Sequence, residues 1–119
     1  MKVIWTNGCF DILHRGHIEL FKFCKSQGDY LVVGIDTDKR VKQNKGPDRP
    51  FNKEEDRSFF LESIKYIDKV VMFSSDEELE QRLVENGVDI MIVGSDWQGN
   101  RVVGEEKVTK VLFFDRIGT

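Results

Sequence analysis

His14 and His17, three residues apart with Gly16 between them, are the side chains of this sequence best suited to chemistry. They stand in the stretch GCFDILHRGH, residues 8–17, between an apolar run predicted to be a strand and an amphipathic run predicted to be a helix. A helix that begins beside the end of a strand presents unpaired N–H groups and the positive end of its dipole, which suit phosphate. Two imidazoles at that position can donate hydrogen bonds to a phosphorus centre as charge builds on its oxygens. We therefore interpret this stretch as the candidate active site.

The other groups of this stretch have less specific patterns. Gly16 is interpreted functionally, because a side chain there would keep phosphate away from the backbone. Asp11 can either orient a histidine or cap the turn, and the sequence favours neither role. A zinc site is a weaker alternative, since no third ligand is suggested nearby. Cys9 has no metal-ligand spacing and is given no catalytic role, whereas Cys24 is expected to be a buried thiol.

Length and charge set further limits. A chain of 119 residues is expected to form one domain, residues 1–119, with one modest core. The net charge of −3 argues against a nucleic-acid binder, which needs a basic surface, but permits an anionic substrate. No apolar run approaches the roughly 20 residues that span a bilayer, and the first residues lack the features of a signal peptide. With too few cysteines for a disulfide scaffold, we expect a cytoplasmic location without a membrane partner.

Apolar runs of β-forming residues alternate with helical patterns along the chain. The predicted strands are residues 2–6, 30–35, 70–73, 90–93 and 108–114; the predicted helices are residues 18–25, one opened by Asn52 and one capped by Ser75 or Asp76. This alternation predicts an α/β protein, a Rossmann-like three-layer sandwich with a five-stranded parallel sheet. Ligands bind at the carboxyl ends of the strands in such sheets, so the polar segments 7–17, 36–49 and 94–101 should face one cleft.

Apolar spacing gives each helix an expected core face. The expected buried residues are Leu20, Phe21 and Cys24 in the first helix, Phe59, Phe60 and Ile64 in the second, and Leu79, Leu83 and Val84 in the third. Asn52 and Glu55 have the spacing of a capping box for the second helix. Residues 39–51 are polar and irregular, which favours a solvated loop. The alternative is a mobile loop that brings Lys42, Lys45 or Arg49 onto a triphosphate.

The stretch GCFDILHRGH resembles the (H)xGH signature of the nucleotidyltransferase superfamily. With the preceding Thr6-Asn7 it is similar to the nucleotidyltransferase domain of heptose-phosphate adenylyltransferases, as are Lys45-Gly46, Arg49-Pro50, Asn52 and Arg57. The second half is closer to glycerol-3-phosphate cytidylyltransferases, since KYIDKV at 65–70 resembles their RYVDEV and GSDWQG at 94–99 resembles their GDDWxG. Their arginine is Lys65 here, which lacks the bidentate fork of a guanidinium.

The resemblance implies roles for individual residues. His14 and His17 would stabilise the transition state at the α-phosphorus, and Lys45 would contact phosphates. The implied nucleotide-binding residues are Gly8, Cys9, Phe10, Gly16, Asp96, Trp97 and Arg116. The sequence ends at Thr119, before the family's Ser-Thr-Thr segment and the helix that this segment begins. Either the sequence is a piece of a longer chain, or that part of the site is absent.

The implied reaction is nucleotidyl transfer, in which an acceptor phosphate attacks the α-phosphorus of a nucleoside triphosphate and pyrophosphate leaves. We expect the base to lie by the fourth strand, so Asp96 and Trp97 favour CTP and a small phosphorylated alcohol such as glycerol 3-phosphate. The first half of the chain favours the alternative, ATP and a sugar 1-phosphate such as heptose 1-phosphate. A second alternative is a domain that binds a nucleotide without turnover. Mg²⁺ is expected with the triphosphate, no metal site is expected in the protein, and the resemblance implies a homodimer.

Overall fold

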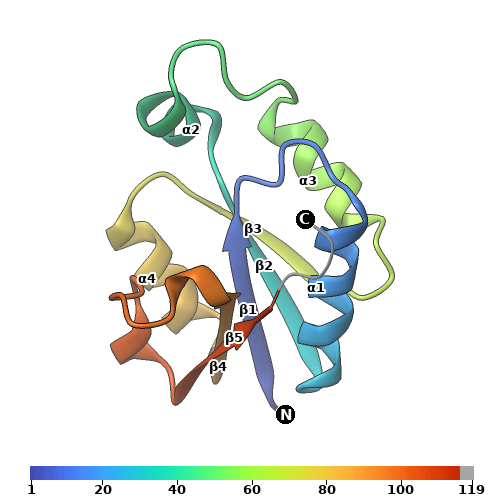
Figure 1. Cartoon of the computed structure of the whole chain (residues 1–119), viewed down its shortest axis with the longest axis vertical. Coiled ribbons are helices and arrows are strands. Elements are labelled where there is room, and N and C mark those ends of the chain that lie inside the picture. The colour runs from blue at the N-terminus through green and yellow to red at the C-terminus, as the bar shows by residue number, and fades with distance from the viewer. Residues whose placement is uncertain (116–119) are drawn as a thin grey trace.

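Five parallel strands form the centre of the molecule, in the order β3-β2-β1-β4-β5. The structure, a computed structural model, describes residues 1–115, so the predicted nucleotide-binding residue Arg116 lies outside the described residues. Along the chain the elements are β1 (Val3–Gly8), α1 (Arg15–Ser26), β2 (Tyr30–Asp36), α2 (Asp38–Lys45), α3 (Glu54–Glu62), β3 (Lys69–Phe73), α4 (Asp76–Glu85), β4 (Ile90–Gly94), the 3-10 helices η1 (Ser95–Trp97) and η2 (Glu105–Lys107), and β5 (Lys110–Phe114). This arrangement confirms the predicted fold class (Figure 1).

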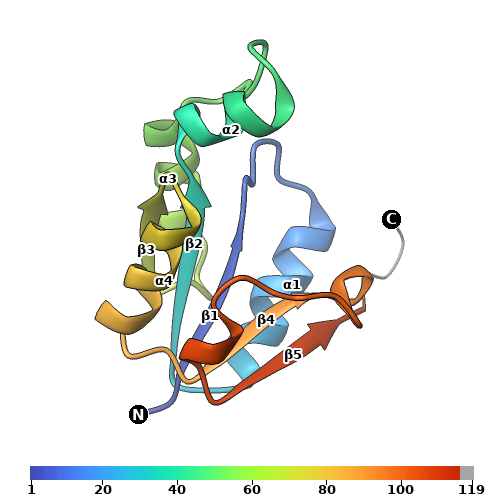
Figure 2. The same ribbon diagram turned by 90° about the vertical axis from the view of Figure 1, so that its left-hand side faces the viewer.

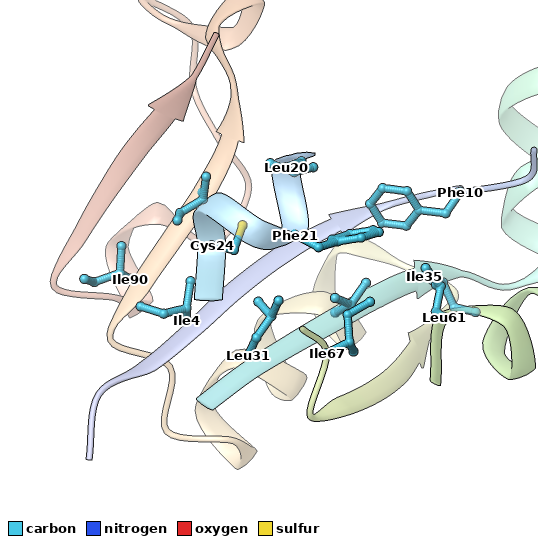
Figure 3. Close-up of a cluster of buried hydrophobic side chains, with 12 residues drawn as sticks. Ile4, Phe10, Leu20, Phe21, Cys24, Leu31, Ile35, Leu61, Ile67 and Ile90 are labelled. Atoms are coloured by element: carbon cyan, nitrogen blue, oxygen red, sulfur yellow. The ribbon is translucent and has the colours of Figure 1, made fainter. Parts of the chain in front are cut away.

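Helices cover both faces of the sheet and so give three layers. Figure 1 shows α1 and α3 on one side of the strands and α4 on the other. Successive residues of a strand point to opposite faces, so the apolar runs of β1 and β2 supply both cores. Ile4 and Leu31 pack beneath Phe21 and Cys24 of α1 (Figure 3), whereas Trp5 belongs to the cluster under α4. The thiol of Cys24 is fully buried, as predicted.

The sheet splits at the carboxyl end of β1. The ladder between β1 and β4 ends at Trp5 and Met91, whereas the ladder between β1 and β2 continues to Gly8 and Ile35. The chain proceeds from β1 to β2 and β3 on one side and returns to β4 and β5 on the other, which makes β1–β4 the topological switch point. The buried hydroxyl of Thr6 donates to the carbonyl oxygen of Ile92 at 2.8 Å across the split. This geometry opens a crevice directly after β1.

Helix α2 replaces most of the loop predicted at residues 39–51. Thr37 caps it, because its hydroxyl accepts from the N–H of Arg40 at 3.3 Å, and Gly46 ends it with a φ of 103°. Val41 is the buried residue of this helix, so the segment has no apolar periodicity to indicate a helix. A capped, polar helix extends beyond the end of β2, at the top of the sheet in Figures 1 and 2.

Helix α3 does not begin as predicted. Lys53 rather than Asn52 is at the N-cap position, and no side chain caps the helix, so the predicted Asn52–Glu55 capping box is wrong. The amide of Asn52 instead donates to the carbonyl oxygen of Asp11 at 2.7 Å. The side chain of Asn52, which its spacing predicts to cap α3, therefore makes a long-range hydrogen bond to Asp11 instead.

The predicted core faces of two helices are partly wrong. Phe59 and Phe60 are 67% and 46% exposed, and α3 instead buries Arg57 and Leu61 against the sheet. These two residues are one helical turn apart and so lie on the same face of α3. Because one of them is an arginine, this buried face cannot be recognised from the spacing of apolar residues. Val84 of α4 is 63% exposed, although the other two residues predicted for that face are buried.

Gly34 leaves room for a buried indole. A Cβ atom at this position would lie 2.4 Å from Cζ2 of Trp5, which is fully buried. Gly34→Ala is therefore expected to lower the free energy of unfolding by about 1–3 kcal/mol through overpacking, measured by urea denaturation. Adding Trp5→Phe removes the obstructing atoms and should recover part of the loss. Unchanged stability of Gly34→Ala would contradict this packing.

Candidate active site

A cleft of about 680 Å³ lies at the carboxyl ends of β1, β2 and β4. All three polar segments predicted to follow strand ends contribute to its wall, as expected from the parallel sheet. The predicted site residues that line it are Gly8, Cys9, Phe10, His17, Lys45, Asp96 and Trp97. His14 and Gly16 are not among the lining residues. His14 is exposed at the start of α1, and Gly16 lines a smaller pocket between α1 and Phe114.

The two histidines begin helix α1 together. His14 is the N-cap residue, and its Nδ1 accepts from the N–H of Gly16 at 3.0 Å. In return, Nδ1 of His17 accepts from the N–H of His14 at 3.2 Å. This is the reciprocal pattern of a capping box, with imidazoles in place of a hydroxyl and a carboxylate. Because each Nδ1 accepts, each ring in its neutral form carries its proton on Nε2.

Phe10 supports the imidazole of His17. The two rings meet edge to face with their centroids 5.4 Å apart, and Phe10 is buried. Its backbone is left-handed, with a φ of 49°, which turns the ring back over the end of β1. A Cβ atom on Gly8 would lie 3.1 Å from Cζ of that ring. Gly8 and Phe10 therefore shape the wall around His17.

Asp11 fastens the histidine loop to the segment before α3. Its Oδ2 accepts from the N–H of Phe51 at 2.7 Å, and its Oδ1 accepts from the N–H of Asn52 at 2.8 Å. The side chain of Asn52 completes the clamp through the carbonyl oxygen of Asp11. This long-range clamp is neither of the two roles that the sequence left open for Asp11.

Arg57 is named by the family resemblance without a role, and sequence reasoning missed what its side chain does. It is fully buried, and its Nη1 donates to the carbonyl oxygens of Cys9 at 2.9 Å and Asp36 at 2.8 Å. Its Nε donates to the carbonyl oxygen of Asn52 at 3.0 Å, and its Nη2 to Oδ1 of Asp38 at 2.8 Å. One guanidinium thereby joins the loop after β1, the end of β2 and the approaches to α2 and α3.

Basic side chains gather on the β2 side of the cleft. Lys45, the last residue of α2, lines the cleft together with Arg40 and Arg49. Lys42 instead donates to the carbonyl oxygen of Arg49 at 2.9 Å and is not among the lining residues. Of the three basic residues considered for a triphosphate, two therefore face the cleft.

Two acidic groups of the cleft have raised pKa values. Burial raises the pKa of the Asp36 carboxyl, although Arg40, Lys45 and Arg57 oppose the shift. Burial likewise raises the pKa of the Cys9 thiol, against the opposing charges of Lys45 and Arg57. A thiol with a raised pKa is protonated at neutral pH and is a poor nucleophile.

The opposite wall comes from the end of β4. Asp96 and Trp97 lie in η1 and line the cleft, and Trp97 is 50% exposed, so it is not a core aromatic residue. A Cβ atom on Gly94 would lie 2.5 Å from Oδ1 of Asp96, so the glycine leaves room for that carboxylate.

Within residues 1–115, no three His, Cys, Asp or Glu side chains are grouped to hold a metal ion. In the same residues, no helix has the length and apolar character needed to cross a membrane.

His17, in the first turn of α1, lines a crevice at the switch point, with three cationic side chains on the adjacent wall. In an α/β protein this combination suits the binding of a phosphorylated nucleotide. The chain belongs to the cytidylyltransferase-like family, whose sequence model matches residues 5–112. The predicted resemblance to the nucleotidyltransferase superfamily is thus confirmed.

Similar proteins agree with this family. The chain is 40% identical over 114 residues to the bifunctional protein HldE of a Nitratiruptor species, covering 96% of this chain and 24% of the relative. It is 43% identical over 114 residues to HldE of Campylobacter fetus, covering 95% and 24%. The chain therefore spans about a quarter of the length of these relatives. The lipopolysaccharide core biosynthesis protein from Thermoplasma volcanium superposes with a TM-score of 0.84 at 25% identity, over 98% of both chains.

Proposed function

We propose that this domain transfers an adenylyl group from ATP to the phosphate of a sugar 1-phosphate such as heptose 1-phosphate. The HldE relatives, which match nearly the whole chain, support this reaction better than cytidylyl transfer to glycerol 3-phosphate, which the Asp96–Trp97 motif favoured. The observation that carries the proposal is the cleft that His17 at the start of α1 and Lys45 at the end of α2 both line.

In this reaction an oxygen of the acceptor phosphate forms a bond to the α-phosphorus. The bond from the α-phosphorus to the bridging oxygen breaks, and pyrophosphate leaves with the electron pair. The nucleophile is already anionic, so the protein needs no strong base and acts by position and charge. His17 donates its Nε2 proton as a hydrogen bond to an α-phosphate oxygen, aided by the dipole of α1, and Lys45 neutralises charge on the phosphates.

Mg²⁺ is proposed to enter with the triphosphate. The described residues offer no cluster of three ligands, and both oxygens of Asp11 accept from backbone N–H groups. Mg²⁺ keeps several waters and is often held by phosphate oxygens with one carboxylate, a role open to the exposed Asp96 on the cleft wall. The ion would neutralise charge on the β- and γ-phosphates.

A cytoplasmic homodimer is proposed with this activity, and light scattering tests the oligomeric state.

A pyrophosphate-release assay tests the reaction. Each of the four common nucleoside triphosphates is paired with heptose 1-phosphate and with glycerol 3-phosphate, in the presence of Mg²⁺. ATP with heptose 1-phosphate is expected to give the highest kcat/KM. A maximum with CTP and glycerol 3-phosphate would overturn the adenylyl proposal in favour of cytidylyl transfer. Release with none of the pairs, together with calorimetric binding of a nucleotide, would indicate a binding domain without turnover.

A further inference from the structure

Asp36 and Arg40 form an ion pair in the cleft wall that the proposed reaction does not use. Asp36 is the last residue of β2, and its Oδ1 accepts from Nε of Arg40 at 2.9 Å. Nη2 of Arg40 donates to Oδ1 of Asp76 at 2.8 Å, and its guanidinium lies over the ring of Phe73 at 5.4 Å. The side chains of Asp36 and Arg40 are 20% and 21% exposed, and both line the cleft. The pair is therefore held rigidly at the edge of the ligand space.

The pair lies on the opposite side of the histidine loop from Asp96 and Trp97. β2 and β4 flank β1, and Ile35 is the register partner of Gly8, so Asp36 stands beside the beginning of the loop. In the transfer reaction the attacked phosphorus belongs to the nucleotide, and the acceptor oxygen approaches it opposite the leaving pyrophosphate. With the nucleoside on the β4 side, where Asp96 and Trp97 line the cleft, the β2 side beside Asp36 is left for the acceptor.

The chemistry of the pair suits hydroxyl groups better than phosphate. A carboxylate and a guanidinium together are neutral, whereas Lys45 and Arg49 on the same side of the cleft form no ion pair within residues 1–115 and bring positive charge for phosphates. An ionised carboxylate accepts several hydrogen bonds and donates none, so it repels phosphate oxygens and binds hydroxyl donors. The bond to Arg40 fixes one oxygen of Asp36 and leaves acceptor capacity on the carboxylate.

We propose that Asp36, oriented by Arg40, binds the hydroxyl groups of the acceptor and selects a polyhydroxylated sugar phosphate over a shorter phosphorylated alcohol. This inference rests on the proposed transfer reaction and assigns a specificity residue to its acceptor side. A hydrogen bond to a charged group that is lost with the substitution corresponds to about a 10- to 100-fold change in acceptor binding.

Kinetics of Asp36→Asn test the assignment. The variant keeps the shape of the side chain and is expected to raise the KM for heptose 1-phosphate about 10- to 100-fold, with little change in the KM for ATP. The KM for glycerol 3-phosphate should change less, so discrimination between the two acceptors narrows. Because KM does not depend on the fraction of enzyme that is folded, partial unfolding cannot mimic this result. Asp36→Glu, which displaces the carboxylate by one methylene, should also raise the acceptor KM.

Asp76→Asn is the matched control, because it removes the other carboxylate partner of Arg40 and Asp76 does not line the cleft. It should leave the acceptor KM unchanged. An equal rise in both variants would overturn the inference, since loosening of Arg40 would then explain the effect. An unchanged acceptor KM in Asp36→Asn would overturn it while leaving the transfer reaction standing. Absence of turnover by the unaltered chain with every pair would defeat the proposed function, and this assignment with it.

Discussion

Replacing His17 with alanine is expected to lower kcat for pyrophosphate release about 100- to 1000-fold, the usual cost of losing one donor to a developing oxyanion. The structure adds a complication, because His17 also accepts from the N–H of His14 and so helps to begin α1. Alanine removes both functions, and the lost cap should lower the free energy of unfolding by about 1 kcal/mol. Stopped-time pyrophosphate assays and urea denaturation measure the two effects.

His17→Gln separates the two functions. Glutamine is a common partner at this position of a capping box, so it can restore the acceptor for the N–H of His14 without an imidazole. We expect the stability of this variant to approach that of the unaltered chain, while kcat remains as low as in the alanine variant. If His17→Gln recovered most of the activity, the imidazole would serve to cap the helix, and the catalytic role of His17 would be wrong.

Replacing Arg57 with leucine should have the largest effect on stability. Leucine keeps much of the buried volume but leaves the Asp38 carboxylate and the carbonyl oxygens of Cys9, Asp36 and Asn52 without this donor. Removing one partner of a buried ionic network costs about 3–5 kcal/mol. The midpoint of urea denaturation should fall accordingly. Nucleotide affinity should fall as well, because the histidine loop and the start of α2 lose their common tie.

Two further arginine variants test why Arg57→Leu should lower the stability. Arg57→Lys keeps the charge, but one ammonium group cannot reach acceptors on four segments, so it should recover only part of the stability. Arg101 pairs with Glu106 at 2.8 Å on the exposed surface, and Arg101→Ala should leave the free energy of unfolding nearly unchanged. Equal losses in Arg57→Leu and Arg101→Ala would show that burial and convergence at Arg57 carry no special stability.

Elements with an apolar period of their own could be predicted from the sequence. The strands at 30–35 and 90–93 are continuous β-forming runs, and the observed β2 and β4 extend them by one residue. α1 begins three residues before the predicted start at 18, because His14 acts as an N-cap, a role in which serine, threonine, aspartate and asparagine are usual. α2 could not be predicted in this way, since Val41 is its buried residue and a single apolar position has no period.

In the candidate site, too, local patterns could be predicted from the sequence, whereas long-range contacts could not. The spacing of His14 and His17 and the strand before them are local, so the sequence alone determined a phosphate-suited helix start, and the order of strands determined which segments share an edge of the sheet. The tertiary structure decided how that start is held. Arg57 reaches Cys9 across 48 residues of chain, and Asp11 reaches Asn52 across 41. Such bonds depend on which segments the fold brings together, and no periodicity along the chain records them, because each partner is polar in its own local pattern.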